Sequence, residues 1–360
     1  MKRTFAILLI CLLGMVAYAA TENTHDSNEP LLDSIIMEIA NGSANKYAYT
    51  YDNRNNRIEF LSYTKVSGGT WQNSSKNVYS YDTNDNLVSL LQFNWQSGSW
   101  ENTNKVEYTY DESGHQTSIV QQRWVQGNWL NSNKTEMTYN EQGLCILSVN
   151  YYWESSRWVA YSKQETTFEE HGLLAETRLF SINGNESTCI NRVQYTYNTD
   201  GNCTLSLTQS WSSDEFVNVT KNEYAYEING YQTSDTYYTW SAISNEWEKQ
   251  RQVDYTYDTD GNQILSLTTN WNSGEASNDS KVEYVYYEKG LYSLTTVYSW
   301  NPQSLSWNLI NKSYYYYRSD EMGIECPYIP HLSTTKLLRD GHVLIEKGNK
   351  IYTLQGQEVK

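Results

Sequence analysis

Residues 251–271 read RQVDYTYDTDGNQILSLTTNW, and this stretch contains the signals that decide the fold. Side chains alternate along the run that ends at Tyr257, and they alternate again from Leu265 onward. Alternation with a period of two is typical of β-strands. Between the two runs, Asp258 begins a turn sequence in which Gly261 can adopt the positive φ of a tight hairpin. The stretch therefore predicts one antiparallel β-hairpin.

The same pattern recurs through the middle of the chain. Each copy opens with a Lys or Arg, and successive copies begin 29 to 31 residues apart. These opening residues are Lys46, Lys76, Lys105, Lys134, Lys163, Arg192, Lys221, Arg251, Lys281 and Lys312. Gly occupies the turn position in most copies, and the first two have Asn55 and Asp85, which also tolerate positive φ. A period this regular predicts that each copy is one supersecondary unit of a repeat array.

The predicted fold class is all-β: an antiparallel β-hairpin repeat array of about nine copies, rolled into a spiral, shell or sandwich. Two strands per copy give roughly 18 to 20 strands. Pro is absent between Leu31 and Asn301, which permits long paired strands. Trp100, Val106 and Tyr108 share one parity, so we expect Tyr and Trp on one face, mostly inside the rolled sheet.

Several copies place a Trp on each side of their second turn. Such rings can face each other across the end of a hairpin, where an aromatic pair adds roughly 0.5–1.5 kcal/mol beyond burial. The candidate ligand-binding row is Trp71, Trp95, Trp100, Trp124, Trp129, Trp153, Trp158, Trp240, Trp247, Trp300 and Trp307. A row of exposed rings can stack on sugars and add avidity. The alternative is that these rings anchor the hairpin ends in the core, because they share the apolar parity.

The composition excludes several classes of function. The net charge of −16 repels phosphate backbones, so nucleic acid is not an expected partner. The five histidines (His25, His115, His171, His331 and His342) show no metal-ligand spacing, and neither a Gly-x-Ser-x-Gly elbow nor a phosphate loop occurs. We therefore expect no enzyme, no catalytic residues, no metal and no cofactor. A divergent hydrolase with a site assembled from distant copies remains an alternative.

The turn acids also permit a calcium hypothesis. The sequence Asp258-Thr-Asp-Gly-Asn262 resembles an ion-binding loop, but its Gly is at the fourth position rather than the sixth. Turn chemistry alone already accounts for Asp, Asn and Gly at these positions. The turn explanation is therefore preferred.

The ends of the chain predict export. Lys2 and Arg3 precede an apolar run, and Ala17-Tyr18-Ala19 fits a cleavage site, so residues 1–19 are predicted to be a signal peptide. We expect a cap or linker at 20–45, repeats at 46–320, a linker at 321–335 and a C-terminal tail at 336–360. No later stretch reaches the roughly 20 apolar residues of a membrane-spanning helix. The expected localisation is secreted or cell-surface.

Four cysteines follow the predicted signal peptide: Cys145, Cys189, Cys203 and Cys326. Disulfides are permitted in an exported protein. Cys145 and Cys203, however, occupy the same position two copies apart, which corresponds to a separation of about 19 Å and is too far for a bond. We expect isolated small apolar residues.

The Tyr-x-Tyr-Asp-x-x-Gly-Asn core at Tyr255–Asn262, and with Asn198 in place of Asp at Tyr195–Asn202, resembles the YD repeat of Rhs, teneurin and insecticidal toxin-complex proteins. The resemblance covers about Lys46 to Asp320 and implies a β-strand shell, which in that family sometimes encloses a toxic domain. These copies are longer than the usual YD repeat, and no toxin-sized domain follows them. They are most similar to YD-like proteins of unknown function exported by Gram-negative anaerobes.

The C-terminal tail carries a second resemblance. Leu338 to Gly341 and Leu354 to Val359 resemble the start of a sorting domain of the type IX (Por) secretion system. This resemblance implies association with the outer membrane or cell surface through the tail.

Export, repetition and the missing catalytic signatures together predict a non-enzymatic, adhesin-like repeat protein. Its expected role is to bind or scaffold extracellular material, either glycan or host protein. A structural or encapsulating shell of the YD type without cargo is the second hypothesis, and a divergent hydrolase is the third.

Overall fold

The computed structural model describes residues 30–288, 290–318, 335–339, 342–347, 350–353 and 358–359. The chain forms two compact units, Met1–Tyr316 and Tyr317–Lys360. The predicted signal peptide, Cys326 and nearly all of the predicted linker lie outside the described residues. Every regular element in the described part of the chain is a β-strand. Among the residues that the structure describes, no helix is long and apolar enough to cross a membrane.

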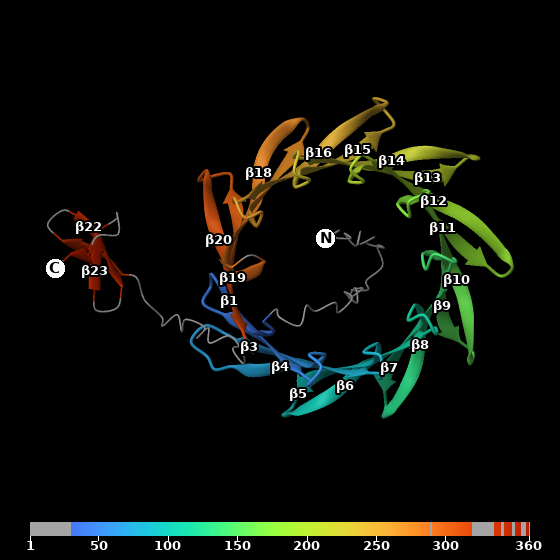
Figure 1. The fold of residues 1–360 in the computed structure, drawn as a ribbon, viewed down its shortest axis with the longest axis horizontal. Coiled ribbons are helices and arrows are strands. Elements are labelled where there is room, and N and C mark those ends of the chain that lie inside the picture. The colour runs from blue at the N-terminus through green and yellow to red at the C-terminus, as the bar shows by residue number, and fades with distance from the viewer. Residues whose placement is uncertain are drawn as a thin grey trace. The chain divides into compact units, whose positions relative to one another are not determined.

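The first unit is a single sheet of 20 strands. Its strands are β1 (Leu32–Ile39), β2 (Ala44–Tyr51), β3 (Arg57–Lys65), β4 (Gln72–Tyr81), β5 (Leu87–Gln96), β6 (Ser99–Tyr110), β7 (Gln116–Val125), β8 (Asn128–Tyr139), β9 (Cys145–Glu154), β10 (Arg157–Phe168), β11 (Leu174–Asn183), β12 (Glu186–Tyr197), β13 (Cys203–Ser212), β14 (Glu215–Tyr226), β15 (Gln232–Ser241), β16 (Glu246–Tyr257), β17 (Gln263–Asn272), β18 (Glu275–Glu288), β19 (Leu291–Asn301) and β20 (Ser306–Tyr317). Consecutive strands pair, and β1 also pairs with β20, so the sheet closes into a cylinder (Figure 1).

The predicted all-β array of antiparallel hairpins is confirmed, and the rolled sheet is a closed cylinder. Its closing strand, β1, comes from the segment that was expected to be a cap or linker. Ala40 N donates to Ile310 O at 2.9 Å where the first and last strands meet. The chain therefore needs residues before its first repeat to complete the sheet.

The first turn of each copy is built on an Asp or Asn. After β16, Asp258 N donates to Asn262 O (2.9 Å) and Gly261 N donates to Asp258 O (3.1 Å). Asp258 Oδ1 accepts from Asp260 N (3.0 Å) and Asn262 N (2.8 Å), and its Oδ2 accepts from Asn262 Nδ2 (3.0 Å). The carboxylate thus satisfies backbone donors of its own turn, as turn chemistry predicts.

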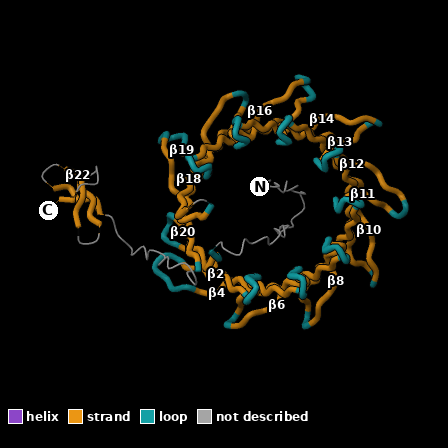
Figure 2. Tube along the Cα trace, viewed as in Figure 1, coloured by secondary structure: helices purple, strands orange, loops and turns teal. Residues whose placement is uncertain are grey.

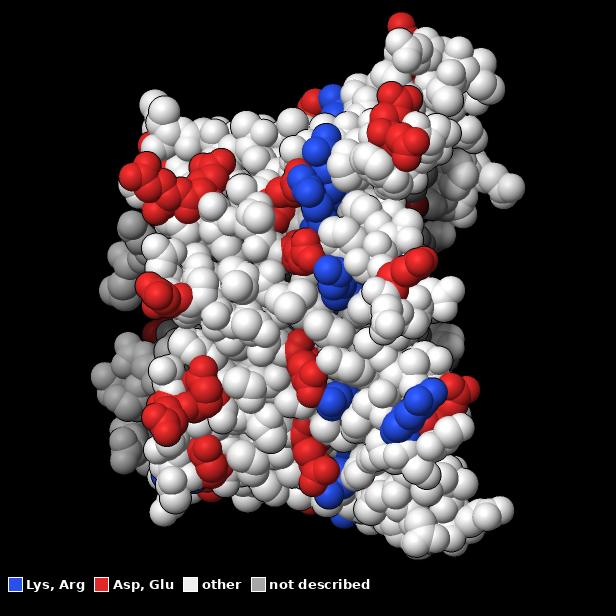
Figure 3. All heavy atoms as spheres, turned by 90° about the vertical axis from the view of Figure 1, so that its right-hand side faces the viewer, with Lys and Arg blue, Asp and Glu red and all other residues white. Residues whose placement is uncertain are grey.

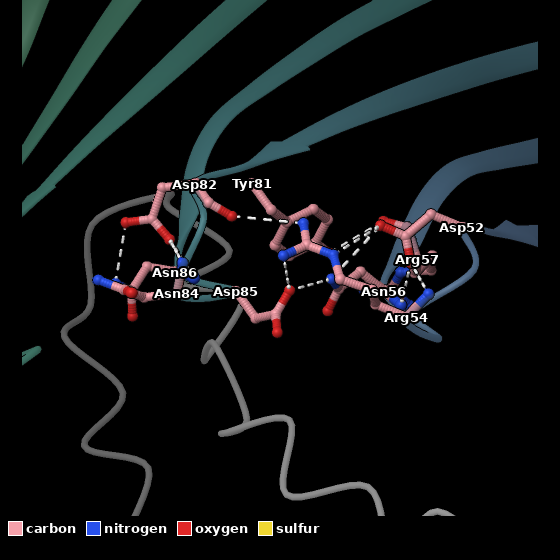
Figure 4. A network of polar contacts seen from close by, with 9 residues as sticks. All are labelled: Asp52, Arg54, Asn56, Arg57, Tyr81, Asp82, Asn84, Asp85 and Asn86. Carbon is pink, nitrogen blue, oxygen red and sulfur yellow. Dashed lines mark hydrogen bonds and ion pairs between the residues drawn. The ribbon is translucent and has the colours of Figure 1, made fainter.

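In the first two copies, polar side chains join neighbouring turns (Figure 4). Asn55 and Asp85 have φ of 66° and 65°, which confirms that they replace Gly at the turn position. Arg54 Nη1 lies 2.7 Å from Asp85 Oδ1, and Asn56 Nδ2 donates to the same oxygen at 2.6 Å. Arg54 Nη2 also donates to Asp82 O at 3.3 Å. One turn therefore supports the positive φ of the next.

The second Tyr of the repeat motif hydrogen-bonds to the preceding copy. Tyr110 Oη donates to Leu87 O at 2.8 Å, and Tyr257 Oη donates to Gln232 O at 2.9 Å. The same bond is made by Tyr51, Tyr81, Tyr139, Tyr197, Tyr226 and Tyr286. Phe could not donate this bond to the carbonyl of the preceding copy, which accounts for Tyr at this position in most copies.

One extra residue interrupts the register of each Trp-bearing hairpin. In the β5–β6 pair, Gln92 lies opposite Asn104 and Phe93 lies opposite Asn102, which leaves Thr103 without an opposite residue. The equivalent residues are Ser74, Ser132, Tyr161, Ile190, Val219, Gln250, Asp279 and Ile310. A β-bulge of this kind moves the following side chains to the opposite face of the strand.

Beyond the bulge, neighbouring copies separate. Pairing between β6 and β7 runs from Tyr110 to Asn104 and stops there, whereas β5 and β6 stay paired as far as Ser99. We call the segments beyond the last pair between copies the hairpin ends: residues 66–74, 95–103, 124–132, 153–161, 182–190, 211–219, 240–250 and 271–279. They project from the cylinder as separate loops (Figure 2).

The second unit is a small antiparallel sheet of four strands. Its strands are β21 (Thr335–Arg339), β22 (His342–Lys347), β23 (Lys350–Thr353) and β24 (Glu358–Val359). They pair in chain order, each with the next. The similarity of this segment to a sorting domain stays a prediction.

Candidate functional site

The bulge places Trp and Tyr on opposite faces of the sheet. Between Leu91 and Trp95 the strand β5 has no bulge, and there Leu91 lies opposite Lys105 and Trp95 lies opposite Trp100. Leu91 and Trp95 share a parity, so both Trp rings lie on the face of Lys105, and Tyr108 lies on the other face. The prediction that Tyr and Trp share one inward face is therefore wrong. The numbering parity of Trp100 and Tyr108 conceals the extra residue between them.

The face that carries Lys105 is the outer one. Figure 3 shows a column of basic groups beside a column of acidic groups across the outside of the cylinder. Ion pairs between a Lys and the Glu two residues later recur there: Lys105–Glu107, Lys134–Glu136, Lys163–Glu165, Lys221–Glu223 and Lys281–Glu283. Exposed pairs of this type contribute about 0–1 kcal/mol each. The Tyr side chains of the repeat motif consequently line the inside.

Several opening Lys side chains also contact aromatic rings of the next hairpin. Lys134 Nζ lies 4.4 Å from the ring centroid of Tyr151 and 5.5 Å from that of Trp158. Lys76 Nζ lies 5.3 Å from the centroid of Trp100. At partly exposed sites a cation over a ring contributes roughly 0.5–1 kcal/mol. These lysines thereby hold the rings of one hairpin against the preceding hairpin.

The Trp residues form edge-to-face pairs across the hairpin ends, as predicted. Trp95–Trp100, Trp240–Trp247 and Trp300–Trp307 have centroid separations of 5.0 Å, Trp124–Trp129 of 4.9 Å and Trp153–Trp158 of 4.8 Å. Their interplanar angles run from 60° to 68°. Trp153 is 37% exposed, and the other members of these pairs are half-buried. Each pair therefore presents part of an aromatic surface to solvent.

One member of the predicted row, Trp71, lies outside the Trp pairs, and the row lacks two further Trp residues of the hairpin ends, Trp211 and Trp271. Trp71 precedes β4 and is 40% exposed, with Lys65 Nζ at 5.8 Å from its ring. Trp211 forms an equivalent edge-to-face pair with Phe216 at 4.8 Å. A pattern of Trp on both sides of the turn does not identify this pair, because its second ring is Phe. Trp271, also overlooked, lies opposite Ala276.

Arg251 was assigned wrongly as the opening residue of its copy. In the other copies the opening cation lies five residues before the second aromatic residue of the motif, and Gln252 has that position relative to Tyr257. Lys249 replaces the missing cation on the outer face. Its Nζ donates to Gln252 Oε1 at 2.5 Å and lies 3.9 Å from the ring centroid of Trp271. Arg251 shares the parity of Tyr257 and lies on the inner face.

Hydrogen bonds within the turns lower the pKa of several turn carboxylates. Hydrogen bonds from the Asn262 side chain and backbone lower the pKa of Asp258, and those from Asn86 lower the pKa of Asp82. The backbone N–H of His115 lowers the pKa of Asp111. Within the described ranges, no three or more His, Cys, Asp or Glu residues gather where they would hold a metal ion.

Several ionisable side chains of the inner face are buried enough for their pKa to shift. Burial raises the pKa of Tyr108 and of Tyr255 to about 12. Burial also raises the pKa of Asp235, whose Oδ1 lacks a hydrogen-bond partner among the described residues. Across the described part of the sheet, Cys145, Cys189 and Cys203 are free thiols. Burial raises the pKa of all three, so they remain protonated at neutral pH.

Comparison with known proteins finds weak similarity to solved structures and no match to a family. No family model matches the chain, and no curated protein matches it. A DUF3836 family protein from Bacteroides vulgatus is 18% identical over 33% of this chain and 90% of its own, with a TM-score of 0.18. A porin-like protein from Bacteroides uniformis is 10% identical over 81% of this chain and 100% of its own, with a TM-score of 0.32.

A third solved structure, of TcdB2-TccC3-Cdc42, is 12% identical over 77% of this chain, with a TM-score of 0.31. This chain covers 16% of that one. At these TM-scores the likenesses do not identify the fold or the function of this chain.

Proposed function

We propose that this chain is a non-enzymatic, secreted or surface-displayed repeat protein that binds or scaffolds extracellular material, with glycan contacting its outer aromatic row. The observation that carries the proposal is the set of half-exposed ring pairs, one on each of several hairpin ends. Copies repeat every two strands, roughly 9.6 Å in the paired part of the sheet. The ring pairs lie on the hairpin ends, where neighbouring copies separate, so they are spaced at least that far apart along the outside of the cylinder. A chain of sugars can therefore contact several pairs at once and gain avidity.

Charge favours an uncharged glycan over an acidic one. The net charge of the chain is −16, and five ion-paired Glu side chains lie on the same outer face. A polyanionic sugar would be repelled at long range. Carboxylates accept hydrogen bonds from hydroxyl groups, so they suit a neutral, hydroxyl-rich ligand.

A glycan array with the purified protein tests the proposal. We expect retention of neutral glycans, and weaker retention by Trp95→Ala combined with Trp124→Ala. Trp100→Phe is the matched control, because the native Trp211–Phe216 pair has the same geometry. It should keep the binding of the unmodified protein. Absence of glycan binding, or binding indifferent to the Ala substitutions, would contradict the proposal.

A structural shell of the YD type is the second candidate, supported by the closed cylinder and its Tyr-lined inside. It predicts that the protein retains its ring pairs but shows no ligand in any binding screen. The expectation that the chain is not an enzyme, and the roles of the signal peptide and of the C-terminal tail, stay predictions. Comparing the cell fractions that hold the full chain and a chain lacking 336–360 tests surface attachment.

A further inference from the structure

The hairpin ends leave strand edges without a neighbouring strand. Residues 99–103 of β6 pair with β5 on one side, and the described part of β7 offers them no partner on the other. The corresponding residues of β8, β10, β12, β14, β16 and β18 are paired on one side only in the same way. Such an edge presents a row of main-chain donors and acceptors that can pair with another chain.

The register shows which main-chain groups are free. Ser97 and Gly98 both have positive φ, so the turn is a two-residue type I′ turn flanked by a hydrogen-bonded pair. Hydrogen-bonded and non-hydrogen-bonded pairs alternate from there, which makes Trp100 and then Asn102 members of non-hydrogen-bonded pairs. The N–H and C=O of these two residues therefore point away from β5. Asn131, Asn218 and Asn278 occupy the same register position as Asn102.

Apolar side chains on these segments remain exposed. On the hairpin ends, Leu130 is 50% exposed and Ile190 is 42% exposed, and both belong to unpaired edges. Val125 and Val219 are exposed as well. Large apolar side chains beside free main-chain groups give both affinity and side-chain pockets for an added strand.

The charge of the hairpin ends determines which kind of added strand they attract. They carry nine acidic side chains: Glu101, Glu154, Glu186, Asp214, Glu215, Glu246, Glu248, Glu275 and Asp279. Arg157 and Lys249 are the two basic ones, which leaves a net charge of −7. Figure 3 shows acidic groups on the projecting hairpins. An acidic edge attracts a basic chain and repels an acidic one, including a second copy of this protein.

We propose that the hairpin ends bind an extended, basic polypeptide segment by β-strand addition, with the segment pairing to the free edge of an even-numbered strand beyond its bulge. The bulge defines the site, because it marks where neighbouring copies stop pairing and where the edge becomes free. The proposal does not depend on glycan binding, since it uses main-chain groups and carboxylates rather than the faces of the Trp rings.

The test removes edge donors without removing bonds inside the hairpin. Pro is tolerated on an edge strand where its missing N–H would face solvent. The test variant therefore replaces Asn102, Asn131, Asn218 and Asn278 by Pro. The control variant replaces the same four residues by Ala, which removes the same side chains but keeps the N–H groups. Circular dichroism checks that both retain the β-sheet signal.

The probe is a fluorescent peptide of alternating Lys and Val, and its binding is followed by anisotropy. We expect the unmodified protein and the Ala variant to bind it equally. The Pro variant should bind fewer peptides per protein at saturation, because the edges of β6, β8, β14 and β18 are blocked and those of β10, β12 and β16 remain. On the unmodified protein, the same peptide with alternate backbone nitrogens methylated should also lose binding, and a Glu–Val peptide should bind weakly.

An equal number of peptides bound by the Pro and Ala variants, or full binding of the methylated peptide, would overturn the proposal because charge alone would then account for binding. Retention of a neutral oligosaccharide without any retention of the Lys–Val peptide would overturn it as well, and would leave glycan binding supported on its own.

Discussion

Replacing Gly261 by Ala should destabilise the protein more than the same change at Gly201, although the two turns share one backbone conformation. Gly261 has φ of +81° and Gly201 has φ of +80°. An L-residue in this region costs roughly 1–2 kcal/mol, partly offset by about 0.4–1 kcal/mol from the stiffer unfolded chain. Gly201→Ala should therefore lower the free energy of unfolding by about 1 kcal/mol.

At Gly261 a neighbouring ring adds to this cost. A Cβ there would lie 1.9 Å from Tyr231 Oη and 2.6 Å from its Cζ, whereas a Cβ at Gly201 would meet nothing within 4 Å. Tyr231 must move, and it then loses its stacking on Tyr257, where the centroids are 4.9 Å apart at 16°. An aromatic pair is worth roughly 0.5–1.5 kcal/mol beyond burial, so the total loss should reach about 2 kcal/mol.

The assay is urea unfolding of both variants, read as a shift in midpoint at constant slope. In a Tyr231→Ala background, Gly261→Ala should cost no more than Gly201→Ala, because the obstructing ring is gone. Equal losses for the two Gly substitutions in the otherwise native chain would refute the steric reasoning. A difference that persists without the Tyr231 ring would refute the assignment of its cause.

Three further outcomes follow from the repeat. The lowered pKa of Asp258 means that its ionised form stabilises the fold above the ordinary carboxyl pKa, and that this stability is lost as pH falls through the lowered value. The substitution Asp258→Asn reproduces the native Asn198 turn, so it should weaken the acid sensitivity of the unfolding midpoint. The pKa of Tyr255 is raised to about 12, so the stability that its neutral hydroxyl contributes is lost as pH rises from about 10 towards 12. Titration followed by tyrosinate absorbance measures this, and ionisation of Tyr255 near pH 10 would contradict it. Tyr110→Phe should lower the free energy of unfolding by about 0.5–1.5 kcal/mol, measured in urea, without preventing folding, because Phe168 occupies this position in another copy. An unchanged urea midpoint would argue against a stabilising hydroxyl.

The strands and turns could be predicted because their signals are local. Alternation and the positive-φ position at Gly261 or Asn55 each act within a few residues, and the structure places both where expected. The bulge could not be predicted from Thr103, because an inserted residue leaves the alternation of Trp100 and Tyr108 formally intact. The position of Arg251 could not be predicted correctly for a similar reason, since this cation lies one residue before the position that the opening cation has in the other copies.

The candidate site was predicted in part. The Trp pairs depend on cross-strand neighbours at a turn, and sequence spacing is sufficient to identify them. Their face depends on the bulge, and their exposure depends on where pairing between copies stops. Neither can be derived from a single copy, because both are properties of adjacent hairpins. Closure into a cylinder likewise depends on how β1 meets β20 at the far ends of the chain.

The pairing of β1 with β20 makes the number of repeats a geometric quantity. In an open solenoid, duplication of one copy lengthens the molecule. In this closed sheet, one more copy adds two strand spacings, about 9.6 Å, to the circumference, and so increases the diameter of the cylinder by about 3 Å. Gain or loss of a copy would therefore change the diameter of the cylinder while leaving the residues of each hairpin end unchanged.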